Sequence, residues 1–424
     1  MMSISSGMPF GILITGALTA WLRSIGVSLK DIGLISLATA PWTFKFLWSP
    51  LVDRFAMRWP DRRRSWVLVS QLLLAAAVAP FAVLAFRSLS GTLTPGQLWL
   101  IGAMAMLIAF AGATQDIALD AYAVEYLRPE EQGPVSGVRI MYWRIGWLLC
   151  SGAAVALSDP AIWNKLGFAV EGNAPWPWVF VGLSLAFLAT LPITIAAEPP
   201  ERPAQPPRTL GSAVVDPLLS YFRRPQAIWF ALFLILYKFG DNLSSSVWIQ
   251  FLIDHGIPRA EIGLVNKTVG LVCSVGGALL GGVLTTKIGL GRALWVFGVV
   301  QGASSALYGM ASLAGAARWA VYAAVAGENL SVGLGTAAQG VLILRLCEKR
   351  FGATQFALLS SLFAVGRTAS GPVAGWSAEL LGYTTHFFVA VLAAVPGLLV
   401  LQKIAPIWQR EVPAATPAPE AAPP

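Results

Sequence analysis

Ten charged side chains lie inside long apolar stretches of this sequence, where a charge is unfavourable. They are Lys45, Asp116, Asp120, Arg139, Arg144, Lys238, Asp241, Lys267, Glu328 and Arg367. A charged side chain at the centre of a membrane-spanning helix costs about 2.5 to 3.5 kcal/mol and persists where it faces a cavity or a partner. Six of the ten are basic and four are acidic, so a polar path lined by them would favour an anionic solute.

Three of these acids, Asp116, Asp241 and Glu328, fall deepest within their apolar stretches. A buried acid whose water exposure or charge partner changes can take up and release a proton. The three residues are therefore candidates for coupling solute movement to protons. The alternative for each is a permanently paired charge that fixes the register of neighbouring helices.

Cations and amides at similar depths are candidates for binding the solute. Lys and Arg would bind carboxylates, and Gln and Asn would hydrogen-bond to hydroxyl and amide groups. Arg139 and Arg144 are five residues apart and cannot share a helix face, so we expect the deeper Arg144 to face the cavity. The solute-binding candidates are Lys45, Gln115, Arg144, Lys238, Asn266, Lys267, Asn329 and Arg367.

The elements that must hold these residues are helices long enough to cross a bilayer. Of the 424 residues, 56% are hydrophobic and 12% are charged, whereas a soluble domain averages about 25% charged residues. A span needs about 20 apolar residues as a helix, and the stretches lack the short alternating pattern of a β-barrel. We predict twelve spans, over residues 7–24, 32–52, 66–86, 98–124, 134–157, 177–196, 227–252, 261–285, 292–312, 318–346, 353–378 and 384–402.

The distribution of basic loops predicts how these spans are oriented. Lys and Arg crowd the loops after the even-numbered spans, for example at Arg62, Arg63 and Arg64, and positively charged loops stay on the cytoplasmic side of a membrane. We therefore expect both termini in the cytoplasm. Residues 1–6 are too few and uncharged to begin a cleavable leader, so the first helix should stay in the mature protein.

A proline-rich stretch at 198–207 (EPPERPAQPP) cannot pack as a membrane helix and divides the chain. The motif DIGL at 31–34 recurs as EIGL at 261–264, and Gln71 recurs as Gln301 at the same offset. We predict an N-terminal six-helix half over 1–196, a cytoplasmic linker over 197–226, a C-terminal six-helix half over 227–402, and a disordered cytoplasmic tail over 403–424.

Two parallel six-helix halves joined by a central loop resemble the plan of the major facilitator superfamily. In that plan helices 1, 4, 7 and 10 line a cavity between the halves, and helices 3, 6, 9 and 12 face lipid. The buried charges agree with it, because spans 3, 6, 9 and 12 contain none. The resemblance implies an all-α polytopic membrane fold of twelve transmembrane helices that works by alternating access.

The loops after spans 2 and 8 are similar to the cytoplasmic signature G-x-x-x-D-R-x-G-R-R of that superfamily. The first loop reads SPLVDR at 49–54 and then RRR at 62–64, and the second has Thr286 in place of the acid. We expect Asp53 to pair with an Arg across the helix ends, while residues 62–64 anchor the loop at the membrane face. The predicted cytoplasmic gate comprises Asp53, Arg54, Asp120, Glu125 and Arg139, and we expect the two acids at the end of span 4 to pair with Arg139.

Several motifs look like those of the AmpG family of muropeptide permeases. They are FKFLWSPLVDR (44–54), ATQDIALDA (113–121), RIG (144–146), VNKTVGL (265–271), RALWVFGVVQGAS (292–304), ATQFALLS (353–360) and VGRTASGPVAGW (365–376). The resemblance covers nearly the whole chain. It implies a proton-coupled importer of anhydro-muropeptides, GlcNAc-anhydroMurNAc and its peptides, in the bacterial inner membrane, which serves cell-wall recycling and so β-lactamase induction. Some members of the family have further helices beyond twelve.

Two other functions are compatible with parts of the sequence. A facilitator could carry another anionic solute, such as a siderophore, coenzyme A or a nucleotide-like molecule, because acetyl-coenzyme A transporters share the FKFLW-SP and ATQDI-type motifs. Asp116 and Asp120 with Glu125 are superficially similar to the Asp-rich pairs by which membrane prenyltransferases bind magnesium diphosphate. Against this enzyme, the second half has no matching pair.

Composition excludes several further classes. The three Cys residues lie far apart and only two His residues are present, so neither a zinc cluster nor a disulfide framework is predicted. The basic residues are not interleaved with exposed aromatics as in a nucleic-acid-binding face. We expect a monomeric transporter, not an enzyme, without metal or cofactor, whose partners are an anionic sugar-peptide, protons and the lipid bilayer.

Overall fold

The structure, a computed structural model, describes residues 1–13, 17–27, 40–55, 59–199, 209–224, 226–257 and 259–411. These residues form helices and connecting turns, with no β-strand among them. Four predictions lie partly outside the described residues: span 7–24 at residues 14–16, the first part of span 32–52 with its DIGL motif, the linker at 200–208, and the tail 403–424 from residue 412 onward.

The N-terminal half is a bundle of long helices. Local sequence explains where they begin: Thr94 and Gln97 form a capping box at the start of α7 (Pro95–Tyr126), and Asp61 accepts from backbone N–H groups at the start of α6 (Arg62–Arg87). The other elements are α1 (Ser3–Leu13), α2 (Ala17–Ser24), α4 (Ala40–Phe44), η2 (Lys45–Leu47), α5 (Ser49–Arg54), α8 (Gln132–Leu148), η3 (Leu149–Ala153), α9 (Ala154–Ala156), α10 (Pro160–Lys165), α11 (Trp176–Ala189) and α12 (Leu191–Ala196).

The C-terminal half contains two broken helices. α14 (Ala227–Leu236) and α15 (Phe239–Asp254) are separated by a turn at Tyr237 and Lys238. α20 (Gly352–Glu411) changes direction at Gly382, whose φ of 75° is accessible to glycine without strain. The other elements are α13 (Leu210–Phe222), α16 (Arg259–Val265), η4 (Asn266–Gly270), α17 (Leu271–Ile288), α18 (Leu290–Leu313), α19 (Arg318–Leu346) and η5 (Lys349–Phe351).

The helices agree with the predicted series of spans and differ mainly at their ends. Within the described residues, nine helical stretches are long and apolar enough to cross a membrane, and one of them, Lys349–Ile404, contains two of the predicted spans. α19 coincides with the tenth predicted span, and α4 to α5 cover the described part of the second. The fold is therefore an all-α membrane architecture that is consistent with twelve spans.

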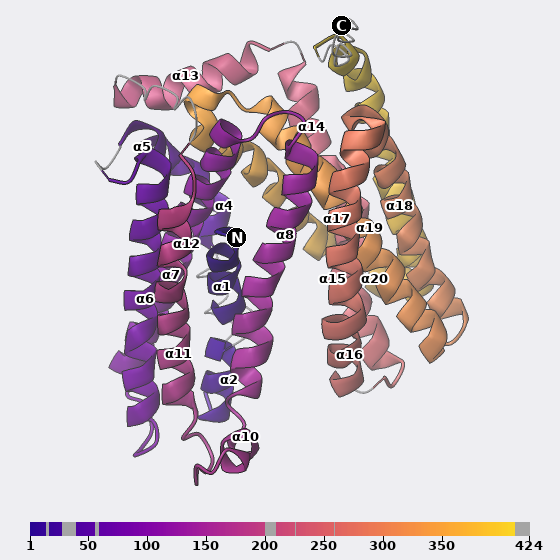
Figure 1. Cartoon of the computed structure of the whole chain (residues 1–424). Coiled ribbons are helices and arrows are strands. Elements are labelled where there is room, and N and C mark those ends of the chain that lie inside the picture. The colour runs from indigo at the N-terminus through magenta and orange to yellow at the C-terminus, as the bar shows by residue number, and fades with distance from the viewer. Residues whose placement is uncertain are drawn as a thin grey trace, which may run out of the picture.

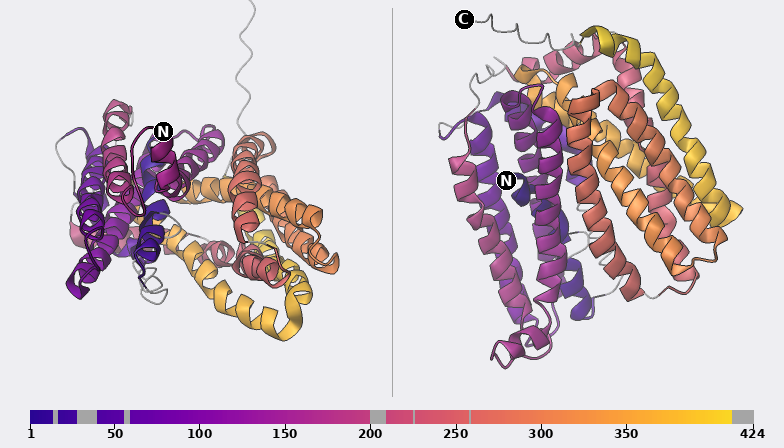
Figure 2. Two further views of the ribbon diagram at one scale, coloured as in Figure 1. Left: turned by 90° about the horizontal axis from the view of Figure 1, so that it is seen from below. Right: turned by 45° about the vertical axis from the view of Figure 1, so that its right-hand side comes forward.

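The two bundles stand side by side and meet at one end of the molecule (Figures 1 and 2). That end, here called the α13 end, carries α5 and α13, and the bundles diverge toward the opposite α10 end, which carries α10 and α16 (Figure 1). Each bundle has its own apolar core, and a further cluster of the C-terminal half also includes residues from the end of α7. A fourth apolar cluster joins the halves, because it combines Val52 and Ile117 with Ala353 and Ala357 of α20.

Glycines allow α8 and α17, which belong to different halves, to pack closely. A Cβ added to Gly137 of α8 would lie 2.5 Å from the carbonyl oxygen of Ala278 on α17, and one added to Gly282 of α17 would collide with the backbone of Gly133. Small residues at such positions let helix backbones approach in membranes. This contact fixes how closely the bundles can approach one another.

We predict that Gly137→Ala destabilises this contact, because its new methyl group has no space. Overpacking of this kind costs about 1 to 3 kcal/mol, which should lower the thermal unfolding midpoint in detergent. The matched control is Gly276→Ala, also at this pair of helices, where an added Cβ meets open space. Equal midpoints for the two variants would show that the α8–α17 contact does not limit stability.

Candidate functional site

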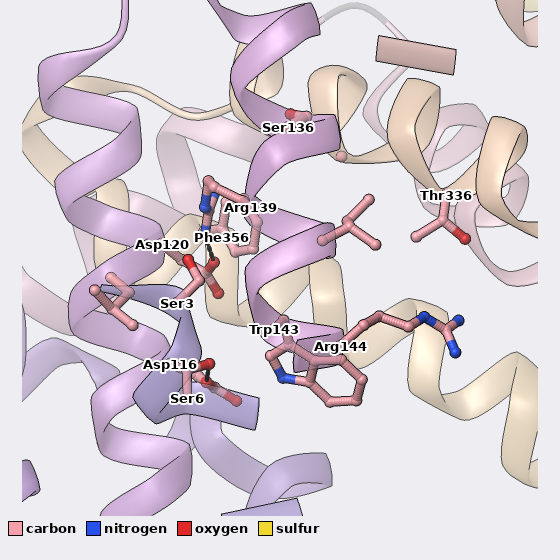
Figure 3. Close-up of a pocket in the computed structure, with 13 residues that line it drawn as sticks. Ser3, Ser6, Asp116, Asp120, Ser136, Arg139, Trp143, Arg144, Thr336 and Phe356 are labelled. Atoms are coloured by element: carbon pink, nitrogen blue, oxygen red, sulfur yellow. Dashed lines mark hydrogen bonds and ion pairs between the residues drawn. The ribbon is translucent and has the colours of Figure 1, made fainter. Parts of the chain in front are cut away.

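A cavity of about 310 Å³ lies between the two halves (Figure 3). Its wall combines helices α1, α7 and α8 of the N-terminal half with α19 and α20 of the C-terminal half. The lining residues are Ser3, Ser6, Asp116, Leu119, Asp120, Ser136, Arg139, Ile140, Trp143, Arg144, Thr336, Gly340 and Phe356. Four of the ten charged residues singled out from the sequence, Asp116, Asp120, Arg139 and Arg144, are thus brought to one site.

Asp116 is held by neutral hydrogen-bond donors. The Ser6 hydroxyl donates to its Oδ1 (Figure 3), and the Trp42 indole N–H donates to its Oδ2 at 2.9 Å. Gly112, one turn earlier on α7, leaves room for the indole, because a Cβ there would lie 2.9 Å from the Trp42 ring. The ion pairs of the described residues do not include Asp116, so it is the acid of this cavity that lacks a cation.

Asp120, one turn further along α7, is neutralised by two cations. Arg139 donates to Oδ1 at 2.5 Å and the Lys45 ammonium lies 3.5 Å from Oδ2. The pairing of Asp120 with Arg139 is the one expected from the sequence for the gate. Lys45, a solute-binding candidate, is buried against this carboxylate and is therefore engaged inside the N-terminal half.

Arg144 differs from Arg139 because none of the acids that the structure describes forms an ion pair with it. It extends from α8 away from Asp116 and Asp120 (Figure 3). Its guanidinium forms no ion pair with the described residues, and its Nε is buried without a hydrogen-bond partner there. An unpaired cation in a poorly hydrated site favours an anionic ligand, and Trp143 beside it offers an aromatic face in the same cavity.

A second charged cluster lies in the C-terminal half, next to the Thr336 side of the cavity. Lys238 is 3.1 Å from Asp241 Oδ2 and also donates to the Thr336 hydroxyl at 3.1 Å. Glu328 on α19 accepts a hydrogen bond from Ser304 at 2.6 Å. Because Thr336 lines the cavity, Lys238 connects the cavity wall with the buried acid Asp241.

The structure does not bring the remaining solute-binding candidates to the cavity lining. Asn266 and Asn329 approach each other beside Gly270, where a Cβ would lie 2.9 Å from the Asn266 side-chain oxygen. Lys267 and Arg367 are exposed on the protein surface and form no ion pair with described residues. Gln115 is fully buried, and its amide donates to the Ser5 hydroxyl inside the N-terminal bundle.

Ser5 belongs to a polar network that the sequence analysis did not predict. Gln71 donates to Ser5 at 3.1 Å and to Thr194 at 2.9 Å, so side chains from α1, α6, α7 and α12 meet at one buried point. A buried hydrogen-bonded network of this kind rigidifies helix packing, although no donor among the described residues reaches the Gln115 side-chain oxygen. The recurrence of Gln71 at Gln301 was the available signal, but its spacing does not reveal the partners.

The α13 end contains a compact ionic cluster centred on Arg63. Arg63 is only 1% exposed and donates to Asp53 at 2.8 Å and to Glu125 at 2.5 Å. Arg62 donates to the same Glu125 oxygen at 2.6 Å. Arg63 is therefore the Arg that pairs with Asp53, and the alternative that residues 62–64 are only anchors at the membrane face does not hold for it.

Asp53 also connects the two halves of the molecule. Its Oδ2 accepts from the backbone N–H of Thr354 at 2.8 Å and from the Thr354 hydroxyl at 2.7 Å, and its Oδ1 accepts from the Ala353 N–H at 3.2 Å. These donors belong to the first turn of α20, where the helix dipole favours a negative charge. Of the other predicted gate residues, Glu125 binds Arg62 and Arg63 rather than Arg139, and Arg54 lies over the Phe55 ring.

Comparison with known proteins assigns the chain to a family. The family model for the Major Facilitator Superfamily matches residues 1–355, and solved transporters of that superfamily share the fold. The fucose:proton symporter FucP in its outward conformation superposes with a TM-score of 0.70 at 12% identity, covering 95% of this chain and 97% of that one. The human organic anion transporter MFSD10 superposes with a TM-score of 0.67 at 13% identity. The chain therefore belongs to the major facilitator superfamily, whose members are transporters and not enzymes.

Relatives with higher sequence identity assign the chain to one family within the superfamily. The chain is 40% identical over 402 residues to the anhydromuropeptide permease of Escherichia coli (strain K12), covering 94% of this chain and 77% of that protein. It is 35% identical over 417 residues to an uncharacterized protein of Haemophilus influenzae, and 26% identical over 409 residues to putative transporter AmpG 4 of Rickettsia conorii. Within the superfamily the chain belongs to the AmpG family.

We predict that Thr354→Val weakens the connection between Asp53 and α20. The substitution removes a hydroxyl donor to a charged acceptor, which contributes about 1.5 to 3 kcal/mol, and it leaves the Asp53–Arg63 pair intact. The equilibrium ratio of molecules with a closed α13 end to molecules with an open α13 end should fall about tenfold or more. Pulsed electron paramagnetic resonance would detect this as longer distances between spin labels at Phe55 and Arg350.

The control for this experiment is Ser360→Ala on the same helix, because the Ser360 hydroxyl donates only to the carbonyl of Ala357 in its own helix. This variant should reproduce the unaltered distance distribution. If Thr354→Val and Ser360→Ala give the same distribution, the hydroxyl bond across the halves does not stabilise the closed end.

Proposed function

We propose that this protein is a proton-coupled importer of anhydro-muropeptides, GlcNAc-anhydroMurNAc and its peptides, which it moves from periplasm to cytoplasm by alternating access. It acts as a monomer in the bacterial inner membrane, with both termini and the α13 end in the cytoplasm. The observation that carries the proposal is the cavity between the halves, whose lining includes Asp116 and an Arg144 that forms no ion pair with the described residues. The relationship to the permease of Escherichia coli supplies the class of solute.

The chemistry of the cavity suits a sugar-peptide with free carboxylates. Arg144 would bind a carboxylate, Trp143 would stack on a sugar ring, and Thr336 and Ser136 would hydrogen-bond to hydroxyl or amide groups, since all four line the cavity. The cavity volume of about 310 Å³ lies at the small end of the range for ligand sites. Because residues of both halves line the cavity, a solute bound there contacts both halves at once.

Closure of the α13 end fits one stage of this transport cycle. Asp53, Arg63 and the first turn of α20 hold the cytoplasmic ends together, so the solute enters from the α10 end. Inward release requires that the bonds from α20 to Asp53 break. Arg63 and Glu125 stay paired within the N-terminal half during that step, so no buried charge is left without a partner.

Other functions fit the structure less well. An alternative anionic solute, such as a siderophore, coenzyme A or a nucleotide-like molecule, would use the same free cation and is distinguished by direct uptake. A prenyltransferase would need Asp116 and Asp120 to bind magnesium diphosphate, but Lys45 and Arg139 already neutralise Asp120. Within the described residues, no group of three or more His, Cys, Asp or Glu side chains is placed to hold a metal ion.

We predict that Arg144→Gln weakens binding of a carboxylate-bearing muropeptide about tenfold or more, because a charge-assisted hydrogen bond is lost. Binding of the uncharged disaccharide portion should change little. Titration of the purified protein with each solute measures the difference. Arg87→Gln, which removes the same charge at the exposed end of α6, is the control, and equal losses for both solutes would assign Arg144 to packing.

We further predict that at least one of Asp116→Asn, Asp241→Asn and Glu328→Gln abolishes accumulation driven by a pH gradient while preserving counterflow exchange. Removal of the titrating group uncouples the proton but leaves the solute path intact. Uptake of labelled anhydro-muropeptide into proteoliposomes measures both modes. Asp159→Asn, at the exposed cap of α10, should behave as the unaltered protein. Normal accumulation in all three variants would contradict the coupling assignment.

A further inference from the structure

Asp241 and Glu328 face each other inside the C-terminal bundle. Asp241 lies in the first turn of α15 and Glu328 lies on α19. Both residues are buried, and their carboxyl groups lie within hydrogen-bonding reach of each other. Lys238, at the break between α14 and α15, is one helical turn before Asp241. Breaks in membrane helices recur at the solute and ion sites of transporters.

The four carboxyl oxygens of this pair have unequal partners. Asp241 Oδ2 is 3.1 Å from the Lys238 ammonium, and Glu328 Oε2 accepts from the Ser304 hydroxyl at 2.6 Å. The other two oxygens, Asp241 Oδ1 and Glu328 Oε1, are buried, and no donor among the described residues reaches them. Two ionised carboxylates are acceptors only and cannot hydrogen-bond to each other.

We propose that Asp241 and Glu328 share one proton and act as a single proton-binding unit, with Lys238 as its counter-ion. This inference rests on the proposed proton-coupled transport and deepens it. A proton on Glu328 Oε1 donates to Asp241 Oδ1, so one hydrogen atom satisfies both orphaned oxygens. The cluster then contains one ammonium, one carboxylate and one neutral acid, and its net charge is zero. Two adjacent carboxyl groups titrate as a pair and not as independent sites.

The surroundings of the pair supply no second cation among the described residues. The other titratable side chains that face it are Tyr308 of α18 and Tyr237 at the helix break. The Tyr237 hydroxyl donates to the carbonyl of Leu294 at 3.0 Å. The Ser304 hydroxyl lies 2.8 Å from that of Ser331, which extends the hydrogen-bonded chain along α19. Among the described residues, Lys238 is therefore the cation whose position determines how strongly the pair binds its proton.

Lys238 also gives this unit a connection to the solute. Its ammonium donates to the Thr336 hydroxyl at 3.1 Å, and Thr336 lines the cavity. A solute carboxylate in the cavity attracts Lys238 and weakens its hold on Asp241, so the pair retains its proton more strongly. When the solute leaves, Lys238 returns to Asp241 and the pair holds its proton less strongly. Solute and proton then favour each other's binding, and this coupling is reciprocal, as symport requires.

Infrared spectroscopy of the protein in lipid nanodiscs at neutral pH tests the shared proton without any solute. The unaltered protein should show the carbonyl stretching band of a protonated carboxylic acid, with a shift in D2O. Asp241→Asn and Glu328→Gln should each remove this same band, because either single acid left beside Lys238 ionises. Glu261→Gln is the control, since both Glu261 oxygens are held by Arg318, and it should keep the band.

Three outcomes of this experiment would overturn the proposal. The first is that the unaltered protein shows no band. The second is that the band survives in both Asp241→Asn and Glu328→Gln. The third is that the band disappears only in Asp116→Asn. Each sample is checked by its thermal unfolding midpoint. Glu328→Asp is the second variant should Glu328→Gln fail to fold, and it should retain a band at a shifted frequency because the acid is conserved.

Proton uptake on solute binding tests the connection through Lys238. At an alkaline pH, where the infrared band of the solute-free protein has disappeared, a pH indicator in weakly buffered solution should record proton uptake when labelled anhydro-muropeptide is added to the unaltered protein. It should record none for Glu328→Gln. Counterflow exchange by the same preparations shows whether the solute is transported at all. Failure of counterflow in the unaltered protein refutes the proposed function, whereas counterflow with an unchanged proton signal in Glu328→Gln refutes the shared proton.

Discussion

The constraint on which this structure depends is that an ionised group inside a membrane protein needs a partner. Ten charges enter the spans, and the fold treats them in different ways. Asp120 is neutralised by Arg139 and Lys45, whereas Asp116 receives only neutral donors from Ser6 and Trp42. Arg144 has no ion partner in the part of the chain that the structure describes. Asp116 and Arg144 both line the cavity between the halves, where a solute can supply the missing partner.

The same constraint separates a structural ionic cluster from a functional one. At the α13 end, Arg63 binds Asp53 and Glu125, and the arrangement within the N-terminal half is complete without α20. The first turn of α20 adds neutral donors to Asp53. When α20 moves away, Asp53 remains paired with Arg63, so no unpaired charge is exposed. In the C-terminal half, by contrast, Lys238 divides its hydrogen bonds between Asp241 and a residue of the cavity wall. A closing contact and a coupling contact therefore use different chemistry.

The fold could be predicted from the sequence because span length and apolar composition are local properties. Helical spacing also separated Arg139 from Arg144 correctly: one binds Asp120 and the other extends away from it (Figure 3). Partners distant in sequence could not be predicted. Nothing near Asp116 indicates Ser6 or Trp42, and the run at residues 62–64 does not reveal that Arg63 is buried. Gln115 was expected near the solute, but helix packing turns its amide toward Ser5.

The central claim is that one solute site is shared by both halves of the molecule. Protection of single cysteines from a water-soluble thiol reagent tests it, with Ile140→Cys on α8 and Thr336→Cys on α19 in a protein lacking Cys150, Cys273 and Cys347. Both positions line the cavity, and Leu313→Cys, at the exposed end of α18, serves as the unprotected control. The account predicts that anhydro-muropeptide slows labelling at Ile140→Cys and Thr336→Cys alike. Protection of only one half, or of neither, would contradict it.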